Sequence, residues 1–224
     1  MNNLIIYQTP SWLTAFTTGR DSGVEALGLR LEELALPRQV HSDNICWMRE
    51  SGRPEQTDAV ITDKPGLCVC VKTADCIPVL LYDTRQHIVA AVHAGWRGTV
   101  ACIVQKTINQ IKPVNPSDIH AIIGPGISLE WFEVGDEVYE TFKTAGFPME
   151  RIARRFPSKA LPLKGIGESW HIDLWDANRW LLEQMGVEDI FVEGTCTRSS
   201  MDFYSARRET INTGRNYNGI YINE

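Results

Sequence analysis

The sequence lacks any long uninterrupted apolar run, and its first residues, MNNLIIYQTP, contain no basic segment ahead of an apolar one. A membrane-spanning helix needs about 20 consecutive apolar residues, and a signal peptide begins with a basic region. Neither pattern is present. We therefore expect a cytoplasmic protein without a membrane partner.

An excess of positive charge is absent as well. The 28 Asp and Glu residues outnumber the 22 Lys and Arg residues, which gives a formal net charge of −6. Proteins that bind nucleic acids usually carry a basic surface, so no nucleic-acid partner is expected. Small anions are not excluded, because a few arginines can dominate one cleft of an acidic protein.

Cysteine is too sparse for a disulfide-stabilised secreted domain. Six cysteines are scattered along 224 residues, at positions 46, 68, 70, 76, 102 and 196. In a cytosolic protein most of them would be buried thiols, with one or two available for chemistry. The sequence also has no internal repeat, low-complexity segment or linker, which predicts a single domain over residues 1–224.

Apolar periodicity predicts the secondary structure. Strands are expected at 59–63, 67–73, 76–83, 87–94, 118–126, 188–196 and 218–223, and helices at 98–112, 134–146 and 173–186. The four central strands are apolar on both faces, which is typical of a sheet covered on both sides. Since strands and helices do not alternate strictly, we expect an α+β fold, a mixed-sheet sandwich with flanking helices.

The segment VHAGWRG, residues 92–98, ends a predicted strand at His93 and leads into a predicted helix. A glycine-rich turn of this kind presents backbone N–H groups to an anion, and Arg97 would add a charged fork. The glycines are also compatible with a tight turn that binds nothing. On this segment alone that interpretation is favoured, because short glycine patterns are common.

Two further segments carry candidate ligands. Cys76 lies at the start of a predicted strand beside Asp75, whose carboxylate would raise the pKa of the thiol and disfavour an unassisted nucleophile. A bound metal would reverse this, because coordination deprotonates a thiol. In QVH, residues 39–41, an extended backbone would put Gln39 and His41 on one face, with His41 at a strand end near solvent.

His41, Cys76 and His93 each fall at the end of a predicted element. Two imidazoles and one thiolate with a free fourth position have the composition of a catalytic zinc site. The sequence has no CxxC or HExxH motif, so the spacing alone is weakly specific. The remaining histidines, at 87, 120 and 171, are expected to be structural or solvated.

A basic segment near the C-terminus, SARRETINTGR at 205–215, contains Arg207, Arg208 and Arg215. With Phe203 and Tyr204 before it, the segment has the composition to clamp a phosphate or stack on a base. A solvated loop with ordinary ion pairs is at least as compatible with the sequence.

Five ordered motifs resemble the bacterial laccase-domain family, from about residue 10 to the end. They are QVH (39–41), TADCIPVLL (73–81), VHAGWRG (92–98), IGPGIS with FEVGDEV (123–138) and FYSARRE with TGR (203–215). Members were first called multi-copper polyphenol oxidases and later described as zinc-dependent purine nucleoside phosphorylases with adenosine deaminase activity. The resemblance implies a zinc site on His41, Cys76 and His93, and a fold similar to that of a bacterial toxin deamidase with a Cys–His pair.

The chain departs from the family pattern at two places. Trp131-Phe132 stands where many members carry Cys-Tyr, and Ala206 replaces an aromatic residue of the SxRR motif. The first departure suggests that this cysteine is not needed for the metal. The second removes the aromatic side chain that would stack on a substrate at position 206.

The resemblance thus implies phosphorolysis of adenosine, inosine or 5′-methylthioadenosine, with purine nucleosides and phosphate as small-molecule partners. Arg97 and the 95–98 turn, assisted by Arg207 or Arg208, are candidates to hold phosphate, and Gln39 is a candidate substrate contact. The same zinc would deaminate adenosine by lowering the pKa of a bound water to about 7. Asp75 is a candidate proton shuttle or partner of a ligand histidine, and a residue that only caps a turn is an equal alternative. A monomer or a small homo-oligomer is expected.

Other functions remain open. A copper-dependent polyphenol oxidase needs a histidine-rich cluster besides its blue-copper centre, and five histidines are too few, although copper is an alternative metal for an N/S site. A metal-free cysteine hydrolase would use Cys76 as nucleophile and His93 as base. A binding module without catalytic activity is a further alternative, but it would give the three candidate ligands no function.

Overall fold

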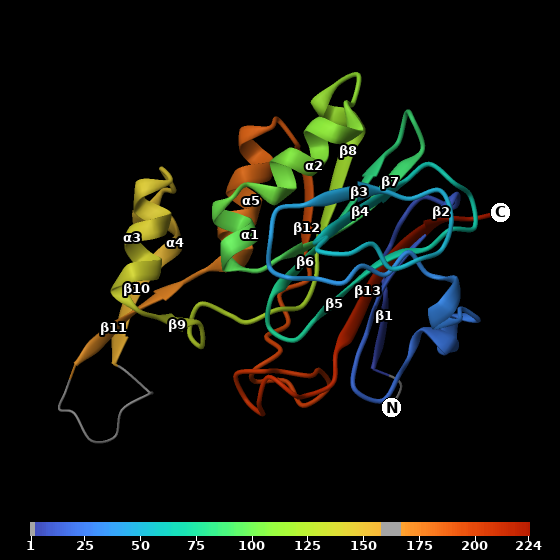
Figure 1. Ribbon diagram of the computed structural model, residues 1–224. Coiled ribbons are helices and arrows are strands. Elements are labelled where there is room, and N and C mark those ends of the chain that lie inside the picture. Colours follow the sequence, from blue (N-terminus) through green and yellow to red (C-terminus); the bar gives the residue numbers. More distant parts are fainter. Residues whose placement is uncertain (1–2, 158–166) are drawn as a thin grey trace.

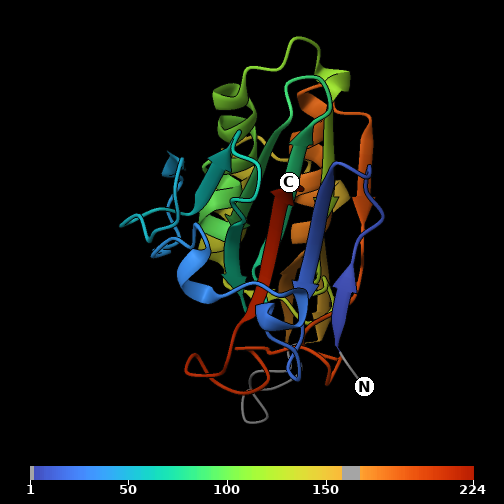
Figure 2. The same cartoon turned by 90° about the vertical axis from the view of Figure 1, so that its right-hand side faces the viewer.

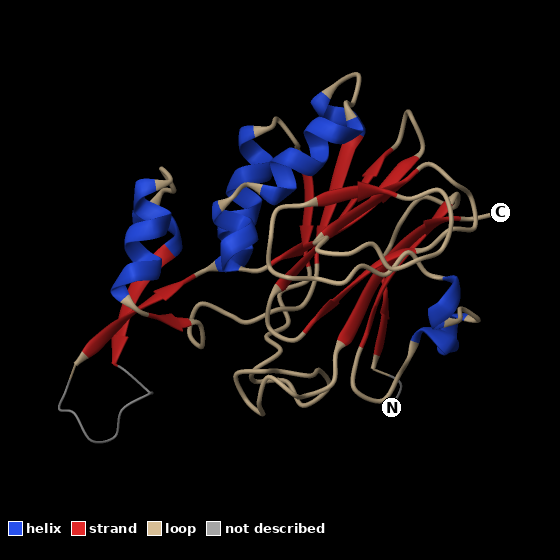
Figure 3. Ribbon diagram, viewed as in Figure 1, coloured by secondary structure: helices blue, strands red, loops and turns tan. Residues whose placement is uncertain are grey.

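The computed structural model describes residues 3–157 and 167–224, and its main elements form three stacked layers (Figure 1). Helices cover one face of a six-stranded sheet, and a four-stranded sheet covers the other face. Figure 2 shows the four-stranded sheet in front with the α-helices behind. In Figure 3 the α-helices gather on one side of the strands, while the short 3-10 segments near the N-terminus lie on the other side. This is the mixed α+β architecture that the sequence predicts.

The six-stranded sheet positions the candidate ligands. Its order is β12 (Asp189–Val192), β8 (Ile119–Ile123), β6 (Ile77–Asp83), β7 (Ile88–Ala94), β4 (Ala59–Thr62) and β3 (Ile45–Trp47). The outermost pairs, β12–β8 and β3–β4, are parallel, and the inner pairs are antiparallel. The predicted mixed sheet is therefore confirmed.

The four-stranded sheet completes the sandwich, and a three-stranded sheet lies to one side of it (Figure 1). The four-stranded sheet has the order β1 (Leu4–Ile6), β2 (Leu13–Thr18), β13 (Asn216–Ile222) and β5 (Val69–Thr73), and a three-stranded sheet has the order β10 (Ala153–Pro157), β11 (Glu168–Ile172) and β9 (Glu133–Val134). Short 3-10 helices within the described residues occupy Val24–Leu27, Leu31–Glu33 and Pro116–Asp118. Because β5 and β13 pair antiparallel, the end of the C-terminal loop lies next to the TADC segment.

Strands β6 and β7 are buried along their whole length, as their apolar sequences predict. Alternate side chains of β6 take part in two different cores: Ile77, Val79 and Leu81 pack with the helices, whereas Leu80 and Tyr82 pack between the two sheets. This alternation follows from the period of two in a strand. It confirms a sheet covered on both sides.

The helices are α1 (Trp96–Val100), α2 (Ile103–Ile111), α3 (Asp136–Thr144), α4 (Met149–Ile152) and α5 (Leu174–Gln184). The predicted helix 98–112 is divided at Cys102, whose φ of 60° interrupts the helical backbone. The apolar stripe of α2 is buried as its spacing of three and four predicts. Asp173 caps α5 by accepting a hydrogen bond from the Asp176 N–H at 3.0 Å.

Several elements were not foreseen, among them β1, β2, β3, α4 and the sheet β9–β11. Most are short or polar, so they lack the apolar pattern of the central strands. Among the residues that the structure describes, no helix has the length and apolar character to cross a membrane.

Candidate metal centre and active site

Cys76 and His93 are brought together by the hairpin of β6 and β7. In this antiparallel pair Pro78 lies opposite His93, and Cys76 directly precedes β6. Strand alternation puts His93 on the same face as Val89 and Ala91, which is the face toward the four-stranded sheet. The same alternation puts Cys76 on the face of Leu80. Both side chains therefore enter the space at one end of the sandwich.

His41 reaches the same place from a loop. The expected extended segment 38–41 with His41 at a strand end is wrong: these residues form no strand, and His41 has a φ of 62°. A histidine in this left-handed region needs support from its surroundings. The support comes from Asp58, which precedes β4 and accepts hydrogen bonds from the N–H groups of Val40, His41 and Ser42 at 3.2, 3.0 and 2.8 Å.

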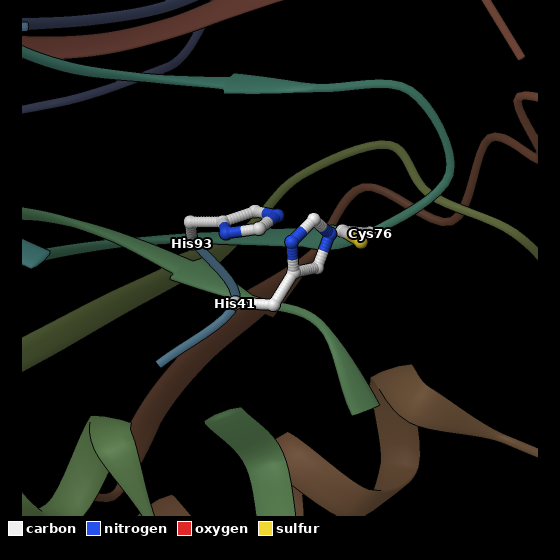
Figure 4. Close-up of side chains that lie close together, drawn as sticks. All are labelled: His41, Cys76 and His93. Atoms are coloured by element: carbon white, nitrogen blue, oxygen red, sulfur yellow. The ribbon is translucent and has the colours of Figure 1, made fainter. Parts of the chain in front are cut away.

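The three side chains converge from the loop, the start of β6 and the end of β7 (Figure 4). Their ligand atoms all lie within 4.8 Å of one another, and the rings of His41 and His93 are 4.8 Å apart, inclined by 75°. His93 is buried, Cys76 is half-buried and His41 is exposed. The cluster is thus anchored in the core on one side and accessible on the other.

Asp58 also fixes His93. Its carboxylate is fully buried and accepts a hydrogen bond from His93 Nδ1 at 2.8 Å, while its carbonyl accepts one from the His93 N–H at 2.8 Å. With Nδ1 engaged, Nε2 is the nitrogen left to bind a metal or the Cys76 thiolate. One carboxylate therefore holds both candidate histidine ligands.

The electrostatics of the cluster favour a deprotonated thiol. Burial raises the pKa of Cys76, but the positive charge and hydrogen bonds of His93 and His41 outweigh burial and lower it to about 6. Burial lowers the pKa of His93, but the Cys76 thiolate and Asp58 raise it to about 9. Burial likewise raises the pKa of Asp58, yet hydrogen bonds from His93 and Ser42 bring it down to about 2. The pKa of the thiol is therefore lowered by the two imidazoles, whereas the sequence led us to expect that Asp75 would raise it.

These donors fit a zinc ion. Zinc is bound in proteins by thiolate sulfur and imidazole nitrogen, and catalytic sites have three protein ligands with one open position. Within residues 3–157 and 167–224, this is the one group of three such side chains close enough to share an ion. A metal would displace the proton from His93 and use the thiolate that the site already favours.

The glycines of VHAGWRG allow the cluster to close. A Cβ on Gly95 would lie 3.1 Å from Cys76 Sγ and 3.2 Å from His41 Cδ2, and one on Gly98 would lie 3.2 Å from the Ser42 carbonyl oxygen. Since these distances are tighter than ordinary carbon contacts, side chains here would push the ligands apart. The glycines therefore serve the candidate metal site by close packing.

A pocket of about 240 Å³ opens over the cluster. Its lining, besides the three candidate ligands, consists of Gln39, Lys72, Ala74, Ala206, Ile211 and Arg215. The Gln39 side chain is also engaged with β5, because its Nε2 donates to the Lys72 carbonyl and its Oε1 accepts from the Lys72 N–H, both at 2.8 Å. Gln39 thus lines the pocket and fixes the edge of the sheet beside it.

Asp75 has the contacts of a structural residue, which the sequence allowed beside a catalytic role. Its carboxylate accepts hydrogen bonds from Thr197 Oγ1 at 2.7 Å and from the Arg207 N–H at 2.6 Å, and its φ is 93°. The carboxylate hydrogen-bonded to a candidate ligand histidine is that of Asp58. Asp75 instead holds the loop that supplies Ala206, Ile211 and Arg215 to the pocket.

The expected phosphate contacts are not brought to the pocket. Arg207 donates to the carbonyls of Trp131 and Glu133. Arg208 donates to backbone carbonyls of residues 197, 198, 200 and 203 and contacts Glu209, so it stabilises the loop. Arg97 is exposed, and its guanidinium carbon Cζ lies 4.3 Å from the centre of the Trp96 ring. None of the three lines the 240 Å³ pocket.

The remaining histidines have structural contacts. His87 stacks on Trp12, His120 contacts Asp189 at 2.6 Å and stacks on Tyr82, and buried His171 bonds the Leu129 carbonyl through Nδ1 at 3.0 Å. The expectation that they are structural or solvated agrees with these contacts.

Comparison with known proteins identifies the family. Residues 14–223 match the family model of multi-copper polyphenol oxidoreductase laccase. The chain belongs to this laccase family. It is 43% identical over 209 residues to the purine nucleoside phosphorylase of Bacteroides thetaiotaomicron, a match that covers 86% of this chain and 74% of the relative. It is 39% identical over 210 residues to the adenosine deaminase RL5 of an unknown prokaryotic organism, covering 87% and 77%.

Solved structures of laccase-family relatives have the same fold. A Neisseria meningitidis protein aligns with a TM-score of 0.84 at 28% identity, covering 99% of this chain and 100% of that one. YlmD from Geobacillus stearothermophilus aligns with a TM-score of 0.81 at 25% identity, covering 96% and 93%. The family that the sequence motifs resemble is thereby confirmed.

Sequence reasoning missed Asp58 and Lys72. The hydrogen bonds of Asp58 reach residues 16 to 18 positions away, and His93 is 35 positions away, so no local pattern signals them. The only sequence clue is that Asp58 directly precedes an apolar strand; its complete burial is visible only in the structure. Lys72 was read as part of an apolar strand, although it is the strand's one charged residue.

Proposed function

We propose that this laccase-family protein is a zinc-dependent purine nucleoside phosphorylase that cleaves adenosine, inosine and 5′-methylthioadenosine, and that it also deaminates adenosine. The observation that carries the proposal is the His41–Cys76–His93 cluster at the wall of a 240 Å³ pocket. The relatives named purine nucleoside phosphorylase and adenosine deaminase support both activities.

The ligand set would be His41, Cys76 and His93. When bound there, zinc supplies Lewis acidity, which lowers the pKa of water to about 7 in related chemistry. The chain's own part is to keep the thiol deprotonated, to hold His93 through Asp58 with Nε2 free, and to leave one side of the cluster accessible. These features favour a preorganised site.

Phosphorolysis joins a phosphate oxygen to the ribose C1′ while the bond from C1′ to the purine N9 breaks. The electron pair of that bond leaves with the purine, which takes up a proton, so the products are free base and ribose 1-phosphate. Deamination exchanges the 6-amino group of adenosine for an oxygen from water and releases ammonia. Both reactions require a purine nucleoside beside the cluster, and Ala74, Ala206 and Ile211 supply an apolar wall for a flat base.

The family description also includes copper oxidase chemistry, which has less support in this chain. A multi-copper oxidase needs several metal centres. The described residues, 3–157 and 167–224, bring together one group of three ligands, and the other histidines contact Trp12, Asp189 and Leu129. Copper is expected to bind at the same three residues as an alternative metal.

The proposal is tested by measuring metal content and nucleoside turnover on the same samples of wild-type protein and of Cys76→Ala and His41→Ala. Adenosine is supplied with and without phosphate, and adenine, inosine and ribose 1-phosphate are separated by chromatography. Cys102→Ala is the matched control, because Cys102 lies between two helices away from the pocket lining. Variants that lose metal but keep full turnover would refute a zinc mechanism. Cytoplasmic location and a monomeric or small homo-oligomeric state remain predictions.

A further inference from the structure

Within the described part of the chain, Lys72 is a cation without a carboxylate partner, and it lies on the wall of the candidate metal-site pocket. Its side chain is half-buried on β5, and no ion pair links it to an acidic residue of the described chain. Removing an ammonium group from water without a counter-charge costs free energy. In a protein whose acidic residues outnumber its basic ones, such a lysine favours an anionic ligand.

The backbone of Lys72 is held from both sides. The Gln39 side chain forms two hydrogen bonds of 2.8 Å with its N–H and carbonyl groups, and Tyr217 of β13 lies opposite it in the sheet. The strand that bears the ammonium group is therefore fixed relative to the metal site. The flexible side chain of Lys72 can therefore extend into the pocket from a backbone whose position is fixed.

Arg215 is the second cation of the pocket. It directly precedes β13, and the pairing of Asn216 with Thr73 brings it beside Ala74. Its guanidinium donates to the carbonyls of Ile211 at 2.7 Å and Gly214 at 3.0 Å, and to Thr213. These neutral acceptors orient the group without neutralising its charge.

Lys72 and Arg215 line the same pocket of about 240 Å³. Burial, followed by repulsion from Arg53 and Arg215, lowers the pKa of Lys72. The side chains that line this pocket include no Asp or Glu. An oxyanion between Lys72 and Arg215 would relieve the repulsion, and lysine with arginine is a combination that binds phosphate well.

We propose that Lys72 and Arg215 form a phosphate-binding subsite beside His41 and Cys76. The inference rests on the proposed nucleoside activity, and it replaces Arg97, Arg207 and Arg208 as the phosphate contacts. The shared chemistry is a phosphate oxyanion, which either free inorganic phosphate or a phosphate ester on the nucleoside would provide. Inorganic phosphate is the co-substrate that phosphorolysis requires.

The test compares zinc-loaded wild-type protein with Lys72→Met, Lys72→Arg and the control Lys143→Met, whose lysine lies on α3 beside Glu140. Adenosine phosphorolysis is measured against phosphate and adenosine concentrations separately. Loss of a charged hydrogen bond predicts that Lys72→Met raises the KM for phosphate by about 10-fold or more, with a much smaller change for adenosine. Lys72→Arg restores most of the affinity, and Lys143→Met behaves as wild type.

Calorimetry with inorganic phosphate, and separately with adenosine 5′-monophosphate, gives a readout that needs no turnover. Weaker binding of inorganic phosphate by Lys72→Met assigns the subsite to the co-substrate, whereas weaker binding of the nucleotide alone assigns it to a phosphate ester. If Lys72→Met binds both as tightly as wild type, the subsite is refuted. A wild-type protein that binds phosphate through Lys72 but turns over no nucleoside would refute the proposed function and leave the subsite standing.

Discussion

Asp58 and His93 are joined twice, by the hydrogen bond from His93 Nδ1 to the Asp58 carboxylate and by that from the His93 N–H to the Asp58 carbonyl, both at 2.8 Å. The same carboxylate accepts from the N–H of His41 at 3.0 Å. A single buried side chain thus sets the positions of two candidate metal ligands that are 52 residues apart in sequence, at 41 and 93.

Replacing Asp58 by Asn is expected to weaken zinc binding by about 10- to 100-fold, the usual effect of losing a partner of a ligand histidine. The NH2 group of the Asn side chain would also face one of the backbone N–H groups of residues 40–42. Two donors would then meet, and that N–H group would lose its acceptor. The measurement is competition with a chelator. Asp189→Asn is the matched control, because it changes the other Asp–His pair, at His120. Equal zinc affinity of the two variants would contradict the role of Asp58.

Replacing Gly95 by Ala is expected to disturb the same site by crowding. The added methyl group would lie 3.1 Å from Cys76 Sγ and 3.2 Å from His41 Cδ2. Overpacking of this kind costs about 1–3 kcal/mol, and here it displaces metal ligands. Thermal unfolding with and without zinc measures the effect. Gly52→Ala is the control, since a Cβ there meets only Met48 Cε at 3.6 Å. If zinc stabilises Gly95→Ala as much as wild type, this packing argument fails.

Metal-free protein is expected to be alkylated at Cys76 with a half-maximal rate near pH 6. The thiolate is the reactive form, and the pKa of Cys76 is lowered to about 6, so the rate rises as pH increases through this value. Cys68 and Cys70 stay unreactive, because burial raises their pKa values. Iodoacetamide labelling followed by peptide mass spectrometry assigns the site. A midpoint near 8.5 would show an ordinary thiol, and failure of zinc to protect Cys76 would argue against its role as ligand.

Asp75 is expected to act by positioning the C-terminal loop. Asp75→Asn and Thr197→Val both weaken the attachment of that loop, since Thr197 donates to Asp75 at 2.7 Å. Both variants should raise the KM for nucleoside by a few-fold, with metal content unchanged. Steady-state kinetics over a range of pH distinguishes this from proton transfer. If Asp75→Asn abolishes kcat while Thr197→Val is unaffected, Asp75 is the proton shuttle that the sequence also allowed.

The sequence was informative where local pattern and strand pairing coincide. The apolar strands β6 and β7 were predicted because burial on both faces leaves an uninterrupted apolar run, and their hairpin pairing brings Cys76 to His93. The break at Cys102 was not predictable from apolar spacing, because the stripe continues through it.

Long-range hydrogen bonds account for the errors in the site. Arg207 and Arg208 have the composition of an anion clamp, but their guanidinium groups are used by backbone carbonyls of neighbouring loops. Asp75 stands next to Cys76 in sequence, yet its carboxylate contacts Thr197 and Arg207. Residue types and sequence neighbours indicated which side chains are candidates for chemistry. Contacts between loops that are distant in sequence determine which of those side chains lie together.

The most direct test of the account is the product balance of the zinc-loaded protein with adenosine at rising phosphate concentration. We predict that adenine and ribose 1-phosphate appear in equal amounts, that both depend on phosphate, and that inosine forms without it. Adenine released with free ribose in the absence of phosphate, or no turnover by protein with one zinc per chain, would contradict the phosphorylase assignment.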